Sequence, residues 1–193
     1  MKVIICILVI FVCLFSFPAA AQQGSAFCAE ADGVSCTAIH LGSELDFFPY
    51  LTGGYYASLW AGAGHIRLRG VAAESNLPQM VIRDGFKDLH TAAYALIADY
   101  FFSEDFSGFW IAAGTEYWKS SVKNSDNGVA GHFSSIQLTF GGGYTWKVWK
   151  NFYFNPWAAV HIKAGGSDKM IGGKSYRSNS LLPEASVKIG WYF

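Results

Sequence analysis

Apolar residues alternate with small or polar residues along most of the chain. In the last stretch Ala185, Val187, Ile189, Trp191 and Phe193 occupy every second position. Successive side chains of a β-strand point to opposite faces, so this alternation predicts strands with one apolar and one polar face. We expect such strands at 37–47, 53–69, 88–102, 107–119, 132–146, 152–164 and 184–193.

The polar faces of these strands are rich in Gly, Ala, Ser and Thr, and their charges occur singly. A water-soluble sandwich would carry Lys and Glu freely on its outer face. Small polar residues suit the narrow interior of a barrel instead. Aromatic residues also gather around the connections, as at Trp146, Trp149 and Phe152. Aromatic girdles of this kind are typical of transmembrane barrels, which the pattern therefore favours.

The first 21 residues read as a cleaved secretory signal peptide. Lys2 supplies a positive start, an apolar run follows from Val3 to Phe15, and Ala19, Ala20 and Ala21 offer small residues for cleavage. The run is too short to span a membrane, and no later stretch is long enough to form a transmembrane helix. We expect a single domain over 22–193.

Cleavage would leave two cysteines, Cys28 and Cys36, in an exported chain. An even number of cysteines in such a chain indicates a disulfide. Asp32 and Gly33 lie midway and form a strong turn signal, which would place the two cysteines opposite each other. The alternative is two unpaired thiols. The cysteines are too few for a metal site, so no metal and no cofactor are expected.

Composition narrows the class further. The chain has 193 residues, of which 52% are hydrophobic and 15% are charged, and its formal net charge is zero. It is too apolar to be disordered, and it lacks the positive charge that nucleic-acid binding requires.

The last strand carries the most specific motif. Val187-Lys188-Ile189-Gly190-Trp191-Tyr192-Phe193 resembles the C-terminal signal that the barrel-assembly machinery of bacterial outer membranes reads, with Trp191 and Phe193 as its aromatic residues. The chain is similar in size and pattern to the OmpA membrane domain and OmpX. This resemblance implies an antiparallel up-and-down transmembrane β-barrel of about eight strands in the bacterial outer membrane. It also implies short turns in the periplasm and long outer loops, here at about 70–87, 120–131 and 165–183.

A barrel with both termini in the periplasm needs an even number of strands, and the pattern shows seven. We expect the missing strand at about 22–31, which makes 37–47 a descending strand followed by a short periplasmic turn. The alternative is a strand within 169–178. The stretch 53–69 is irregular, because its parity turns His65, Arg67 and Arg69 outward. Either these residues rise above the hydrocarbon, or a bulge near Gly62–Gly64 turns them inward.

Strand parity also gives a set of charged residues that face the lumen. Charges in a low dielectric must pair, so the set predicts a network of ions that fills a narrow barrel. The second interpretation is a catalytic group built from Ser134 or Ser135, His132 or His161, and Asp99 or Glu116, but nothing in their spacing singles them out. The predicted lumen network comprises Glu44, Asp46, Asp99, Glu116, His161, Lys163, Glu184 and Lys188.

These patterns predict a monomeric outer-membrane barrel with a structural or surface-binding role and no wide pore. Its partners would be outer-membrane lipid and lipopolysaccharide, and the assembly machinery during biogenesis. Alternatives are a lipid-modifying enzyme of the lipid A class, a small-solute channel and a secreted, lipocalin-like binding protein. No catalytic residue is assigned.

Overall fold

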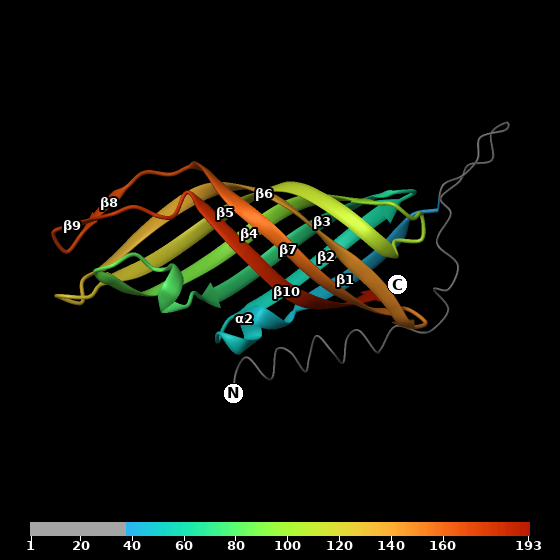
Figure 1. Cartoon of the computed structure of the whole chain (residues 1–193), viewed down its shortest axis with the longest axis horizontal. Helices are drawn as coiled ribbons and strands as arrows, with labels where there is room; N and C mark the ends of the chain where they lie inside the picture. The colour runs from blue at the N-terminus through green and yellow to red at the C-terminus, as the bar shows by residue number, and fades with distance from the viewer. Residues whose placement is uncertain (1–37) are drawn as a thin grey trace.

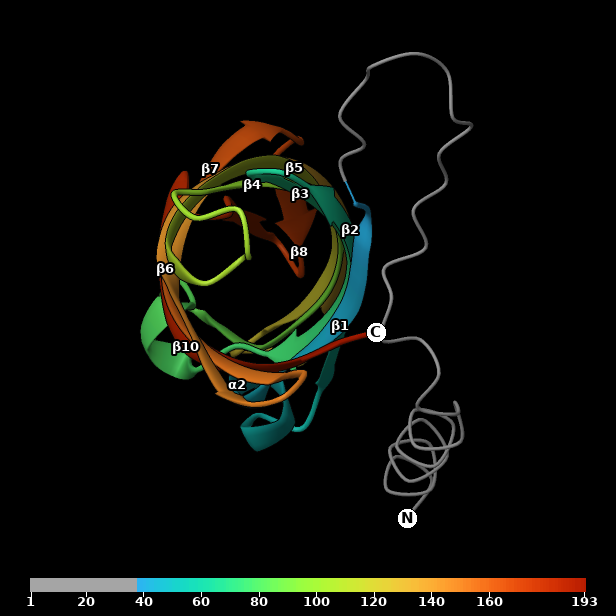
Figure 2. The ribbon, with the colours of Figure 1, turned by 90° about the vertical axis from the view of Figure 1, so that its right-hand side faces the viewer.

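Eight antiparallel strands pair in chain order and close into a ring, in which β1 pairs with β10 (Figures 1 and 2). This computed structural model describes residues 38–193. The expected all-β, antiparallel, eight-stranded class is confirmed. The strands of the ring are β1 (His40–Asp46), β2 (Tyr55–Ala63), β3 (Ile66–Asn76), β4 (Phe86–Phe101), β5 (Gly108–Asn124), β6 (Ala130–Trp149), β7 (Phe152–Gly165) and β10 (Leu181–Tyr192).

The eighth strand comes from a hairpin that the sequence pattern concealed. The stretch 53–69 is not one strand, because β2 ends at Ala63 and β3 begins at Ile66, with Gly64 and His65 between them. Gly64 has a φ of 54°, which glycine adopts readily. The two-residue turn shifts the parity of the alternation, so Arg67 and Arg69 point into the lumen and are 0% and 4% exposed. A turn rather than a bulge therefore resolves the irregularity.

The ring is complete without the two stretches proposed for the missing strand. The predicted strand at 22–31 lies outside the described residues, as do the signal peptide and the Cys28–Cys36 pair. Within 169–178 the chain forms β8 (Lys169–Ile171) and β9 (Lys174–Tyr176), a small hairpin that pairs only with itself. The alternative of a ring strand in 169–178 is therefore wrong.

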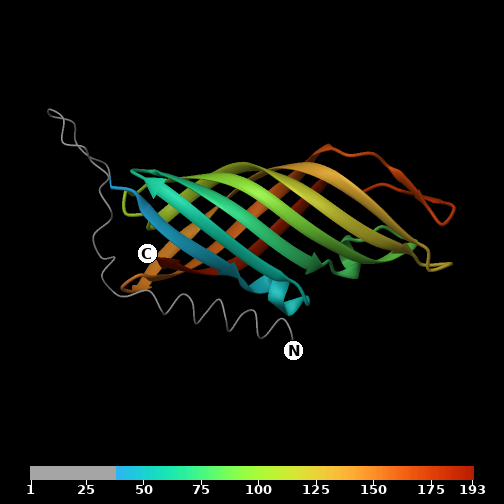
Figure 3. The same cartoon turned by 180° about the vertical axis from the view of Figure 1, so that it is seen from behind.

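Most connections at one end of the barrel are longer than those at the other. The turns at 64–65, 102–107 and 150–151 lie at the end where β1 begins and β10 finishes, which we call the short-turn end. The opposite end, which we call the loop end, carries 47–54, 77–85, 125–129 and 166–180. Figure 3 shows the C-terminus and the β8–β9 hairpin at opposite ends.

The strands run further than the sequence pattern indicated, so the connections at the loop end are shorter than the predicted loops. β3 continues to Asn76 and β5 to Asn124. The connection after β1 belongs to the loop end, which corrects the expectation of a short periplasmic turn there. It contains helix α2 (Phe47–Leu51), and 77–85 contains the 3₁₀-helix η1 (Gln79–Val81). No helix in the described part of the chain is long and apolar enough to cross a membrane.

Large apolar side chains cover the outside of the ring. Leu59 on β2, Leu96 on β4 and Phe109 on β5 are 67%, 63% and 68% exposed. In each strand, outward residues of this kind alternate with residues that face inward. Aromatic residues occupy outward positions near the short-turn end, among them Phe102, Trp146 and Trp149. The outer surface is thus apolar, while charged residues are buried inside.

Candidate functional site

A four-residue ion cluster fills the lumen toward the short-turn end. Glu44 on β1, Arg67 and Arg69 on β3, and Asp99 on β4 are all nearly or fully buried. Arg67 Nε lies 2.7 Å from Asp99 Oδ2, and Arg67 Nη1 lies 2.9 Å from Glu44 Oε1. Arg69 Nη2 lies 2.8 Å from Asp99 Oδ1, and its Nη1 lies 3.3 Å from Glu44 Oε2. Each guanidinium thus bridges both carboxylates, so the cluster has no net charge.

Polar and aromatic side chains complete this cluster. The Tyr153 hydroxyl donates to Glu44 Oε1 over 2.9 Å and accepts a hydrogen bond from Trp60 Nε1 over 3.0 Å. The Arg67 guanidinium lies 4.8 Å from the Phe101 ring centroid. Its Nη2 has no hydrogen-bond acceptor within residues 38–193. The ring contact attracts the cation but provides no conventional acceptor.

The β4–β5 turn closes the short-turn end of the lumen. Phe106, from this turn, is 1% exposed and packs edge-on against Phe101 at a centroid distance of 5.3 Å. Aromatic side chains therefore fill this part of the lumen.

The adjacent Asp105 stays at the surface. Partial desolvation raises its pKa, but hydrogen bonds from Ser103, Ser107 and Lys147 outweigh this effect, so the pKa of Asp105 lies well below its usual range.

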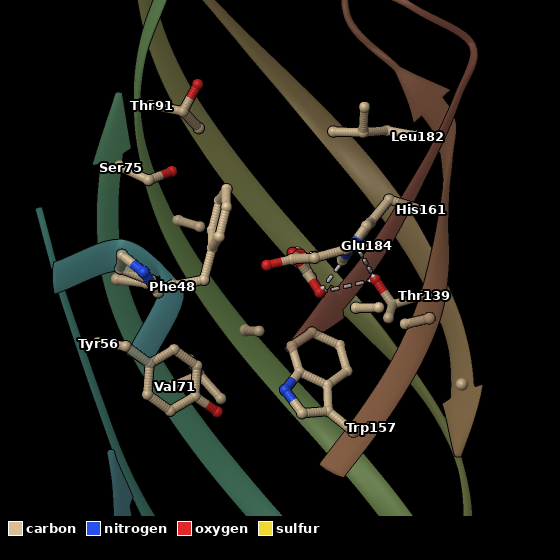
Figure 4. A pocket seen from close by; sticks show the side chains of 18 of the residues that line it. Phe48, Tyr56, Val71, Ser75, Thr91, Thr139, Trp157, His161, Leu182 and Glu184 are labelled. Atoms are coloured by element: carbon tan, nitrogen blue, oxygen red, sulfur yellow. Dashed lines mark hydrogen bonds and ion pairs between the residues drawn. The ribbon is translucent and has the colours of Figure 1, made fainter. Parts of the chain in front are cut away.

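A second cluster lies nearer the loop end and joins four neighbouring strands (Figure 4). His161 Nε2 on β7 lies 2.9 Å from Glu184 Oε2 on β10. His161 Nδ1 lies 3.3 Å from Glu116 Oε1 on β5 and 3.0 Å from Thr139 Oγ1 on β6. The Thr139 hydroxyl donates to Glu116 Oε1 over 2.7 Å.

The geometry of this second cluster fits an ion pair better than a catalytic base. With the Thr139 proton directed to Glu116, the Thr139 oxygen accepts from His161 Nδ1. His161 Nε2 faces the Glu184 carboxylate, which can only accept when ionised. Both ring nitrogens therefore act as donors, as in an imidazolium held between two carboxylates. An imidazole in this state cannot take a proton from a nucleophile.

The structure does not assemble the other parts of the catalytic interpretation. His132 and Ser134 are exposed. Ser135 is buried, and its hydroxyl accepts a hydrogen bond from Gln137 over 2.9 Å. Asp99 belongs to the arginine cluster rather than to the His161 cluster.

The remaining predicted lumen residues occupy separate places. Asp46, at the end of β1, accepts hydrogen bonds from Trp157 Nε1 over 2.6 Å, from the Ser186 hydroxyl, and from the backbone N–H of Phe48 over 3.0 Å. The last bond caps helix α2. Lys163 lies 3.9 Å from Asp168 near the loop end, away from both clusters.

Lys188, on β10, is 1% exposed, and its contacts are aromatic. Its Nζ lies 3.9 Å from the Trp157 ring centroid and 5.6 Å from that of Tyr56.

The terminal aromatic residues of the motif lie at the short-turn end. Phe193 is 39% exposed, and its backbone N–H donates to the Leu41 carbonyl over 2.9 Å. The ring of Trp191 lies 6.4 Å from that of Phe152. The last residue of the motif thus continues the pairing between β10 and β1.

Sequence reasoning missed several residues that complete the clusters. Thr139, Tyr153 and Trp157 were not assigned to the network because parity alone cannot tell a hydrogen-bonding side chain from a filling one. Arg67 and Arg69 were left open because their orientation depends on the 64–65 turn. The combination of Gly64 with the change in parity is the signal that could have found this hairpin.

A cavity of about 340 Å³ separates the second cluster from the aromatic floor beneath it. Small apolar side chains line much of its wall, since Ala residues inside a narrow barrel leave space. Phe48 of helix α2 lies among the cavity side chains in Figure 4. The floor includes Arg69, Trp110, Trp157 and Lys188, and the loop side includes Leu77, Met80 and Leu182.

The chain matches no protein-family model and no curated protein. Within residues 38–193, no group of three or more His, Cys, Asp or Glu residues could hold a metal ion. The features that bear on function are the barrel itself, its apolar outer surface, its filled lumen and its cavity.

Proposed function

We propose that this protein is an integral outer-membrane β-barrel with a structural or surface-binding role. The observation that carries the proposal is the reversed distribution of polarity. Residues such as Leu59, Leu96 and Phe109 are exposed, whereas Arg67, Glu44 and Asp99 are buried. A soluble protein exposes its charges and buries large apolar groups. In lipid the apolar wall is the favourable outer surface, and a closed ring satisfies the backbone groups of every strand.

The two ends suit a fixed orientation in the membrane. The short-turn end would face the periplasm. It contains the start of β1, the end of β10 and the outward aromatic residues. The loop end, with helix α2 and the β8–β9 hairpin, would face outward, where it would contact lipopolysaccharide. We further propose that the signal peptide directs export and that the C-terminal motif guides assembly.

The filled half of the lumen argues against a channel. Arg67, Arg69, Tyr153 and Phe106 occupy the short-turn half, and an eight-stranded ring has little room beyond its own side chains. Conduction would require this network to open. The enzyme alternative is weakened at His161, because both of its ring nitrogens are engaged.

Cell fractionation is the first experiment. The full chain, expressed in a Gram-negative host, should enter the outer membrane and should migrate differently on a gel before and after heating. A soluble periplasmic product would overturn the proposal and favour a lipocalin-like binding protein.

A matched pair of variants tests contact with lipid more directly. Leu96→Arg places a charge on the outer wall near the middle of β4, whereas His90→Arg lies near the loop end of the same strand. We expect Leu96→Arg to lower the free energy of unfolding in lipid vesicles by about 2–4 kcal/mol, and His90→Arg by about 0–1 kcal/mol. Equal, small effects of both changes would contradict burial of this wall in hydrocarbon.

Planar-bilayer recordings separate a closed barrel from the channel alternative. The purified, folded protein should give no steady conductance. Regular single-channel steps would show an open lumen and would contradict the proposed closure.

A further inference from the structure

One polar group on the cavity floor has unfilled hydrogen-bonding capacity. The Lys188 ammonium is 1% exposed and lines the cavity. Among the described residues it makes no hydrogen bond or ion pair, although it lies 3.9 Å from the centre of the Trp157 ring. Cation–π attraction stabilises the charge, but an ammonium has three N–H donors that require acceptors.

The carboxylates nearest to Lys188 are already occupied. Asp46 accepts from Trp157, Ser186 and the Phe48 backbone. Glu44 and Asp99 are held by the two arginines. An acceptor for Lys188 would therefore come from an occupant of the cavity.

One side of the cavity wall is apolar, whereas Arg69 and the cluster of Glu116, Thr139, His161 and Glu184 line other parts of it. The cavity volume of about 340 Å³ lies near the lower end of the range for small-molecule sites, about 300–1,000 Å³. This volume and the apolar side of the wall suit one acyl chain rather than a lipid with several chains. The apolar side is formed by Val71, Ala73, Ala93, Ala95, Ala112 and Ala159.

We propose that the cavity binds a single acyl chain whose terminal oxygen group accepts hydrogen bonds from Lys188. The apolar chain would lie along the alanine-lined wall, and its carboxylate or ester would lie on the aromatic floor. The inference deepens the binding role proposed above and rests on it. A free fatty acid and one chain of a membrane lipid share this chemistry, and the probes below distinguish them.

Photolabelling tests where the chain binds. The folded protein, reconstituted in phospholipid vesicles, is exposed to a fatty acid that carries a diazirine in its chain, and the labelled residues are mapped by mass spectrometry. We expect label on inward residues such as Ala95 and Val71. Label confined to outward residues such as Leu96 and Tyr94 would mean that only surrounding lipid is bound, and would overturn the proposal.

A pair of alanine variants on β4 controls for the outer surface. Ala93 lines the cavity, whereas Ala98 is exposed on the outer wall of the same strand. Ala93→Phe should abolish the inward label by filling the cavity, and Ala98→Phe should leave it unchanged. An inward label that persists in Ala93→Phe would contradict binding in this cavity.

Lys188→Met tests the polar contact while retaining an unbranched side chain. Loss of one charge-assisted hydrogen bond should weaken labelling by the fatty acid about tenfold or more. Labelling by the corresponding diazirine alkane should change little. Equal effects on both probes, or no effect on the acid, would overturn the role of Lys188.

The source of the chain is decided by the same mapping with a second probe. A phospholipid with the diazirine in one acyl chain should give inward label if the site takes the chain of an intact lipid. Inward label from the fatty acid alone would assign a free acid. The absence of inward label from both probes would overturn the proposal.

Heating separates these outcomes from failure of the proposed function. Every variant is checked for heat-dependent gel mobility in the membrane fraction. If a variant keeps this behaviour but loses the label, the substitution has affected binding in the cavity and not the barrel. Loss of membrane location in the unaltered protein would instead overturn the barrel proposal.

Discussion

The two halves of the lumen are filled in different ways. Toward the short-turn end, Arg67 and Arg69 bridge two carboxylates, and aromatic rings occupy the remaining space. Toward the loop end, alanines on several strands leave a cavity above a floor that carries Lys188. The first half is stabilised by ion pairs, and removal of one partner would leave a buried charge without compensation. We expect the second half to tolerate a change in volume, because a cavity lies there.

The largest difference between the halves should appear when an ion pair is broken. Arg67→Met leaves Glu44 and Asp99 with reduced compensation in a buried site, and should lower the free energy of unfolding by about 3–5 kcal/mol. Lys163→Met, the control, removes only a partly exposed pair with Asp168 and should cost less than about 1 kcal/mol. Urea unfolding in vesicles, followed by heat-dependent mobility, measures both. Equal losses of unfolding free energy in the two variants would contradict a special role for the buried ion cluster.

A change in volume gives the next effect. A Cβ at Gly190 would meet the Tyr153 ring, which bonds to both Trp60 and Glu44. Gly190→Ala should therefore destabilise the barrel by about 1–3 kcal/mol through overpacking. Ala93→Phe adds far more volume on the cavity side, yet should be neutral or stabilise by up to about 1 kcal/mol. The same unfolding series would refute the comparison if the larger substitution were the more harmful one.

The smallest effect concerns the turn that closes the filled half. The pKa of Asp105 is lowered in the folded state, so its ionised form contributes stability above the usual carboxyl pKa and loses it as pH falls. Asp105→Asn should cost less than about 1 kcal/mol at neutral pH, because the group is largely exposed. The difference from the unaltered protein should shrink below about pH 4.

The control for this acid dependence is Glu104→Gln in the same turn. Glu104 is exposed, and its nearest ionic partner is His65, with 3.5 Å between Oε1 and Nε2. Its pH profile should follow that of the unaltered protein more closely. A pH-independent cost for Asp105→Asn would show that the turn depends on shape rather than on the charge.

Period-two alternation predicted the strands from 88 onward well, because one face of each strand is apolar over many residues. It was misled at 53–69, where apolar residues continue through the 64–65 turn. Glu74 was assigned to a long loop, but it pairs with Tyr55 and Ala92 within the sheet. The alternation weakens in this region, so the pattern could not show where β3 ends.

The lumen shows the same division. Parity selected Glu44, Asp99, Glu116, His161, Glu184 and Lys188 as inward residues, and all of them lie in the lumen. It did not show that Asp99 joins the arginines while Glu116 joins His161. That choice depends on the stagger of neighbouring strands, which sets the height of each side chain in the barrel.

The sequence alone determined the all-β class, the apolar outer wall and the polar inner faces, because these follow from local alternation along each strand. Tertiary structure alone decided the β2–β3 hairpin, the partners of each buried charge, and the cavity with Lys188 on its floor. These features depend on ring closure and register, which bring together residues such as Glu44 and Tyr153, 109 positions apart in the sequence. No local pattern encodes such a meeting, because it arises only when the last strand pairs with the first.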